Sequence, residues 1–89
     1  MSRHEWREQT DDGETRLVRA VRFGKRWTIE ARLKSERDWT VLKPVPEHDL
    51  RTLRGVLRDK YRRGQAPFEH LAELDAILGP EVEQDDDED

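Results

Sequence analysis

The chain has 89 residues and a formal net charge of −4, and 43% of its residues are charged against 33% that are hydrophobic. These values indicate one small domain whose core contributes on the order of a few kcal/mol of stability. The lack of cysteine excludes disulfides, thiolate metal sites and a thiol nucleophile, and it is typical of a reducing cytoplasm. The sequence has no apolar run of the roughly 20 residues that span a membrane and no secretory signal pattern, so we expect a cytoplasmic protein without a membrane partner.

The charges are strongly segregated along the chain. Residues 1–15 carry two basic and five acidic groups, and residues 16–63 carry 15 basic and six acidic groups. Residues 64–89 carry ten acidic groups and no basic one. The sequence therefore predicts a cationic folded region between acidic ends.

The first segment, residues 1–14, is polar and lacks hydrophobic periodicity, so we predict that it is flexible. Trp6 is its only large apolar residue. Two interpretations of Trp6 stay open, loose packing on the domain and an anchor for a partner. Residues 15–80 are predicted to form a single α+β domain.

The cleanest strand pattern lies at residues 26–34, where apolar and polar residues alternate. Alternation places one set of side chains on a buried face and the other on a wet face. Residues 15–23 precede this strand and residues 38–42 follow it as a short third strand, so we expect a three-stranded antiparallel meander. Pro44 and Pro46 end the sheet because proline donates no ladder hydrogen bond. The expected buried set is Trp27, Ile29, Ala31, Leu33, Trp39 and Val41.

The first hairpin has two possible registers. A two-residue loop pairs Phe23 with Arg26 and suits Gly24 at the first position of a type II′ turn. A three-residue loop pairs Phe23 with Trp27, and it gathers Leu17, Val21 and Phe23 with the large apolar groups of the next strand. We expect the second register because it collects the apolar residues on one face.

Two helices follow the sheet. The first begins near Pro46 and ends at Gly64, and the second begins near Pro67 and ends at Gly79. Their short connection predicts an antiparallel helical hairpin. The apolar stripes are Leu50, Leu53, Leu57 and Tyr61 on the first helix, and Phe68, Leu71, Leu74 and Leu78 on the second.

Residues 81–89 hold seven carboxylates and are predicted to be a disordered acidic tail. The tail either folds back on basic groups and competes with a polyanion, or it keeps the protein soluble. The expected fold is therefore α+β, a three-stranded antiparallel meander packed against a C-terminal helical hairpin (βββαα), with disordered ends.

The candidate binding residues are basic. Clustered guanidinium groups bind phosphates through Coulomb attraction and bidentate hydrogen bonds. The alternative is a solvated surface with internal ion pairs, which contribute little stability. On the sheet the candidates share the wet face, and on the first helix they form one stripe beside the apolar face. They are Arg16, Arg22, Arg32, Lys34, Arg51, Arg54, Arg58 and Arg62.

One segment, Gly24-Lys25-Arg26-Trp27-Thr28-Ile29-Glu30-Ala31-Arg32, followed by Trp39 and a helix, resembles part of the plant AP2 and integrase-type DNA-binding domains. The likeness covers about 30 residues. In those families a three-stranded sheet backed by a helix enters the DNA major groove. The resemblance implies that Arg16, Arg22 and Arg32 contact DNA.

No catalytic or metal-binding pattern stands out. His4, His48 and His70 are too far apart in sequence for a His-Glu-x-x-His set, and no glycine-rich phosphate loop is present. We therefore expect no enzymatic activity, no metal and no cofactor. The predicted function is a small binding module that uses its arginines for an anionic partner, nucleic acid first or else an acidic protein. The alternative is a protein–protein adaptor or regulatory subunit, and the choice between monomer and dimer is open.

Overall fold

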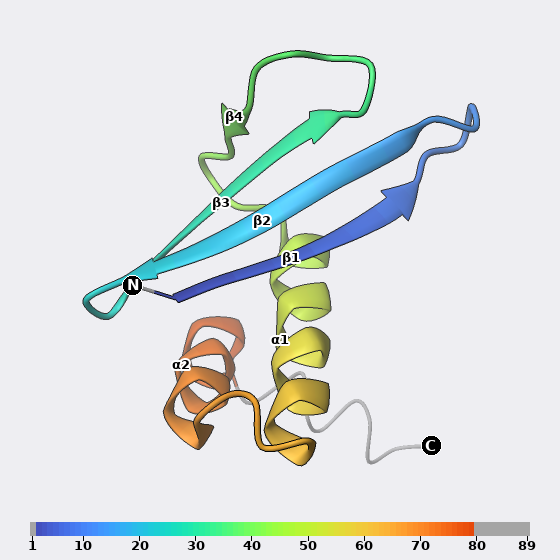
Figure 1. Ribbon diagram of the computed structural model, residues 1–89. Helices are drawn as coiled ribbons and strands as arrows, with labels where there is room; N and C mark the ends of the chain where they lie inside the picture. The colour runs from blue at the N-terminus through green and yellow to red at the C-terminus, as the bar shows by residue number, and fades with distance from the viewer. Residues whose placement is uncertain (1, 80–89) are drawn as a thin grey trace. The chain divides into compact units, whose positions relative to one another are not determined.

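The computed structural model describes residues 2–79, and the predicted acidic tail at residues 81–89 lies outside them. The chain divides into two compact units, Met1–Val45 and Pro46–Asp89. The first holds a four-stranded antiparallel sheet and the second a pair of helices, which confirms the α+β class (Figure 1). The single domain over residues 15–80 stays a prediction. No helix in the described part of the chain is both long enough and apolar enough to cross a membrane.

The sheet is a meander of four strands rather than three. Its order is β1 (Ser2–Gln9), β2 (Thr15–Phe23), β3 (Arg26–Leu33) and β4 (Thr40–Val41), and each strand pairs antiparallel with the next. β1 lies at one edge of the sheet in Figure 1. The prediction of a flexible N-terminal segment is therefore wrong for Ser2–Gln9. The sequence of this strand does not show the alternation of apolar and polar residues that predicts a strand, because charged or polar residues occupy both of its faces.

The turn between β1 and β2 is a three-residue hairpin loop. The Thr10 N–H donates to the Glu14 carbonyl at 2.8 Å, and the Gly13 N–H donates to the Thr10 carbonyl at 3.0 Å. Gly13 has a φ of 87°, the left-handed conformation that such a loop needs at its last position. The Asp-Asp-Gly run that precedes β2 was thus a turn signal for a hairpin.

The register of β2 against β3 follows the two-residue loop, so the expected three-residue loop is wrong. Phe23 stands opposite Arg26. Gly24 has a φ of 65°, whereas Lys25 keeps a negative φ, which is the pattern of a type II′ turn. A shift of one residue moves every side chain of a strand to the other face. Phe23 consequently lies 74% exposed instead of entering the core.

The apolar face of the sheet is built around β2 and β3. Val18 stands opposite Ala31, and Ala20 stands opposite Ile29. All four side chains are buried, with exposed fractions between 0% and 7%. The prediction for β3 is confirmed at Ile29 and Ala31, while the predicted face of β2 is inverted. By alternation, the apolar face comprises Ser2, His4, Trp6, Glu8, Arg16, Val18, Ala20, Arg22, Trp27, Ile29, Ala31 and Leu33.

The last strand is shorter than predicted. Val41 stands opposite Glu30, and it is 42% exposed. Trp39 precedes β4, is half-buried, and its ring lies 4.0 Å from the guanidinium carbon of Arg19. Because Arg19 projects from the face opposite the apolar one, the prediction that Trp39 and Val41 join the core is wrong.

The helical hairpin is confirmed, with α1 spanning Glu47–Arg62 and α2 spanning Phe68–Leu78. α1 is capped just beyond Arg62, where the Gly64 N–H donates to the Tyr61 carbonyl at 3.0 Å and the Gln65 N–H to the Lys60 carbonyl at 2.7 Å. These two bonds form a Schellman motif, for which the positive φ of Gly64 (73°) is required. The buried side chains of the two stripes are Leu53, Leu57, Leu71 and Leu74.

Two contacts show that the helices run antiparallel. Arg54 of α1 forms an ion pair with Asp75 of α2. The rings of Tyr61 and Phe68 lie 5.7 Å apart, nearer the connecting loop. Arg54, in the middle of α1, thus faces a residue late in α2, whereas Tyr61, near the end of α1, faces the first residue of α2, as in an antiparallel hairpin.

Candidate functional site

The face of the sheet opposite the apolar one is rich in arginine, and we call it the arginine face. It carries the odd-numbered side chains of β1 and β2 and the even-numbered side chains of β3, because strands alternate and the pairing has no bulge. Five arginines stand there against two glutamates, so the three strands give this face a net charge of +3. Its residues are Arg3, Glu5, Arg7, Gln9, Thr15, Leu17, Arg19, Val21, Phe23, Arg26, Thr28, Glu30 and Arg32.

The four basic residues that sequence reasoning placed on one wet face of the sheet do not share it. Arg32 lies on the arginine face, and Lys34 follows β3 directly, with its N–H donating to the Thr15 carbonyl at 2.8 Å. Arg16 and Arg22 lie on the apolar face, because the two-residue turn shifts β2 by one position. Arg16 bonds to Glu8 there at 3.1 Å, so its charge is partly compensated.

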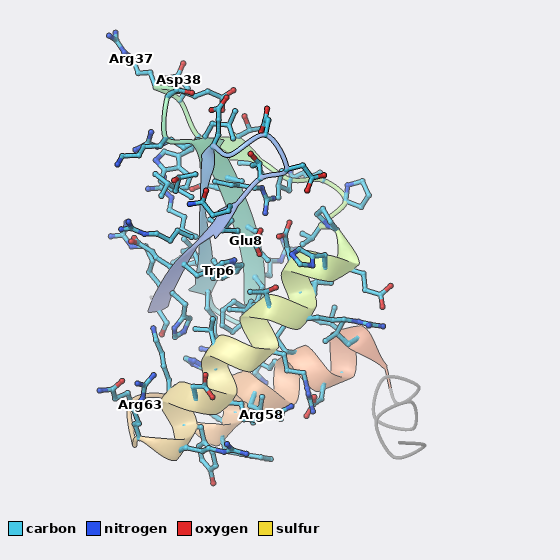
Figure 2. The ribbon with its side chains drawn as sticks, turned by 90° about the vertical axis from the view of Figure 1, so that its right-hand side faces the viewer. Trp6, Glu8, Arg37, Asp38, Arg58 and Arg63 are labelled. Atoms are coloured by element: carbon cyan, nitrogen blue, oxygen red, sulfur yellow. The ribbon has the colours of Figure 1, made fainter. Side chains whose placement is uncertain are left out.

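The four arginines predicted on the first helix all lie on α1, but two of them are engaged in ion pairs. Arg51 pairs with Glu47 one turn earlier. Arg54 pairs with Asp75 and is only 14% exposed, so it acts in joining the helices. Arg58 and Arg62 form no hydrogen bond or ion pair with residues 2–79. Figure 2 shows Arg58 on α1, with Arg63 beyond the end of the same helix.

A cation–aromatic cluster sits on the arginine face. Arg19 Nε bonds to Glu30 Oε1 at 2.5 Å, and the guanidinium carbon of Arg19 lies 4.0 Å from the ring centroid of Trp39. The guanidinium carbon of Arg32 lies 5.2 Å from the same centroid. Guanidinium groups within about 6 Å of an indole are attracted by its ring quadrupole. The cluster therefore holds Trp39 over the sheet.

Arg32 also organises the loop that leads from β3 to Trp39. Its Nη1 donates to the Glu36 carbonyl at 2.6 Å, and the Leu33 N–H donates to the Glu36 side chain at 3.0 Å. At the tip of this loop, Arg37 and Asp38 project away from the sheet (Figure 2). The loop thus brings a tryptophan onto the arginine face, a contact that strand alternation alone does not predict.

Two cavities open on the arginine face of the described residues. The larger, of about 410 Å³, is lined by Arg7, Arg32 and Trp39, with Leu17 and Glu5 beside them and with parts of Trp6 and Val18. The smaller, of about 250 Å³, is lined by Arg3, Arg19, Val21 and Glu30.

Arg7 supplies an exposed positive charge to the larger cavity. Arg7 is exposed and has no hydrogen bond or ion pair within the described residues. The cavity therefore offers a free guanidinium group beside an indole and a short apolar wall. This combination suits a group that is both anionic and flat.

No protein-family model, no curated protein and no solved structure matches the chain. The resemblance to the AP2 and integrase-type domains gains no support from these comparisons. The structure also separates the arginines that the resemblance assigns to DNA, because Arg16 and Arg22 lie on the apolar face and Arg32 on the other.

Proposed function

We propose that the protein is a small non-enzymatic binding module that holds single-stranded nucleic acid on the arginine face of its sheet. The observation that carries the proposal is the larger cavity, where Arg7 and Arg32 meet the indole of Trp39. Single-strand binders combine a positively charged surface that follows the backbone with aromatic rings against which bases stack. The cytoplasmic location and the lack of a metal or cofactor stay predictions from composition.

The spread of positive charge along the arginine face favours an extended anionic partner. Arg3, Arg7 and Arg26 are exposed cations spread along the face, and Arg19 and Arg32 lie between them. Arg3 stands 3.8 Å from Glu5, but both side chains are more than half exposed, so this pair is weak and exchangeable. A strand of phosphates would displace counterions from several of these groups at once.

The proposal is tested by fluorescence anisotropy with a labelled oligonucleotide of thymidine or uridine and with the matching duplex, at two salt concentrations. Full-length protein should bind the single strand, with an affinity that falls steeply as salt rises. Replacing the seven carboxylates of residues 81–89 by amides should strengthen binding if the tail competes for the arginines.

Two variants locate the site. Trp39→Leu should weaken binding by about tenfold through lost stacking, and Arg7→Gln should lower the salt slope by about one. Arg37→Gln is the matched control, since it removes the same charge from the loop tip outside the cavity. Absence of binding at low salt, in both the wild type and the amide variant, refutes the proposal.

A second candidate function, a protein–protein adaptor, rests on the exposed apolar residues of the helices. Tyr61, Phe68 and Ile77 are 46%, 58% and 51% exposed. Solvent-exposed clusters of this kind mark protein interfaces when they are contiguous. Replacing Phe68 and Ile77 by serine should then abolish capture of a cellular partner while leaving oligonucleotide binding unchanged. Capture that survives both replacements argues against this surface.

A further inference from the structure

The outer edge of β1 is an unpaired strand edge of regular geometry. Among the described residues, β1 pairs only with β2. Edge strands in natural proteins are usually protected by being short, bulged, broken by proline, covered or charged. The opposite edge of the sheet, β4, is protected by its length, because it has two residues. β1 has eight residues with an unbroken register and no glycine or proline, so it is protected only by its charges, and a strand with complementary charges can still pair with it.

The hydrogen-bond pattern identifies the residues that face this open edge. The Lys34 N–H donates to the Thr15 carbonyl, so the odd-numbered residues of β2 bond toward β3 and the even-numbered ones toward β1. The Thr10 N–H donates to the Glu14 carbonyl, which agrees with even-numbered residues of the first hairpin bonding inward. The backbone groups that point outward from β1 are therefore those of Arg3, Glu5, Arg7 and Gln9.

The order of charges along β1 disfavours most registers in which β1 could pair antiparallel with β1 of a second copy. If Glu5 stood opposite its own copy, Arg3 would also stand opposite Arg7 of the second copy. If Arg7 stood opposite its own copy, two guanidinium groups would meet at the centre. Like charges directly opposite each other destabilise a sheet. A pairing centred on His4 avoids these clashes but joins only residues 2–6.

A pairing centred on Trp6 sets opposite charges opposite each other. It is also longer, since it joins residues 3–9. Glu5 then stands opposite Arg7 of the second copy, twice by symmetry, and Arg3 stands opposite Gln9. These are the residues with outward backbone groups, so each such pair can exchange both of its backbone hydrogen bonds. The side chains of Glu5 and Arg7 are exposed, so both can reach a partner on the arginine face.

We propose that the protein forms a homodimer in which β1 pairs antiparallel with β1 of a second copy, with Glu5 opposite Arg7 of that copy. The two arginine faces join into one continuous surface, because antiparallel pairing of the edges extends the sheet from four strands to eight. Trp6 stands opposite its own copy on the apolar face. The inference rests on the strand edge and its backbone groups and not on the cavity, although Glu5 and Arg7 belong to both.

Sedimentation velocity of the full chain over a concentration series tests the dimer. Wild type should show a monomer–dimer equilibrium. Arg7→Glu places two carboxylates opposite each other across the interface, and Glu5→Arg places two guanidinium groups there. Each variant alone should raise the dissociation constant about tenfold or more. An equimolar mixture of the two variants restores opposite charges at both positions and should yield a heterodimer.

Two further variants distinguish loss of the dimer interface from loss of folding. Glu5→Pro removes an outward N–H that β2 does not use, so circular dichroism should be preserved while the dimer is lost. Arg37→Glu makes the same charge change as Arg7→Glu at the tip of a loop, and it should dimerise like wild type. A wild type that stays monomeric at all concentrations overturns the proposal. So does a mixture of the two charge variants that forms no heterodimer.

Discussion

Breaking the contact between Arg19 and Trp39 should destabilise the protein by an amount that depends on both residues. Arg19 is 25% exposed and its partner Glu30 is 22% exposed, so solvent screens their ion pair only in part. Such a pair contributes up to about 1 kcal/mol. The cation–π contact of Arg19 at 4.0 Å adds about 0.5–1 kcal/mol at this exposure. Arg19→Met, which keeps the aliphatic stem, should therefore cost about 1–2 kcal/mol.

The assay is urea unfolding of Arg19→Met, Trp39→Leu and the double variant, followed by circular dichroism and tryptophan fluorescence. The coupling energy between the two sites should be about 0.5–1 kcal/mol, because each single variant removes the same cation–π contact. Arg26→Met combined with Trp39→Leu is the control, since Arg26 lies on the same face without contacting Trp39. Additivity of Arg19 and Trp39 within about 0.3 kcal/mol would show that the cation–π contact between them contributes no stability.

Four other predictions concern the turns, helix α1 and the core. Gly24→Ala should lower the free energy of unfolding by about 1–2 kcal/mol, because the φ of Gly24 is 65°. Gly55 lies in helix α1, and no atom lies within 4 Å of a Cβ added there, so Gly55→Ala should raise the free energy of thermal unfolding by about 0.5–1 kcal/mol. Leu57→Ala should cost about 2–5 kcal/mol in urea, since this side chain is fully buried. The Thr10 hydroxyl bonded to Asp12 lowers the pKa of that carboxyl below 3.8, so an NMR titration should find the pKa reduced, and Thr10→Val should raise it.

The lowered pKa of Asp12 makes the stability of the fold depend on pH in a defined direction. Because the pKa of Asp12 is lower in the folded protein, its hydrogen bond stabilises the fold at neutral pH. That contribution begins to fall below pH 3.8, the ordinary value, and it is lost as the pH passes through the folded pKa. A pKa of 3.8 or above would show that the carboxyl gains nothing from Thr10.

Local pattern was enough for the central strand and for both helices. Strict alternation in β3 identified Ile29 and Ala31 as buried. Apolar residues at helical spacing, with Gly64 as a stop signal, located α1 and α2 to within a residue or two. These elements are predictable because the period of their apolar residues equals the period of the backbone. The segregation of charge along the chain was likewise visible without a structure.

Only the tertiary structure decided which side chains share a face. The hairpin register depends on the turn conformation at Gly24, and a shift of one residue sends Arg16 and Arg22 to the apolar face. β1 became visible as a strand only through its pairing with β2, because its own pattern is polar on both sides. Arg54 and Trp39 met their partners across 21 residues and 20 residues of chain, through folding that no local period encodes. Sequence therefore determined β3, both helices and the segregation of charge along the chain, and three-dimensional pairing determined β1 and where the charge gathers.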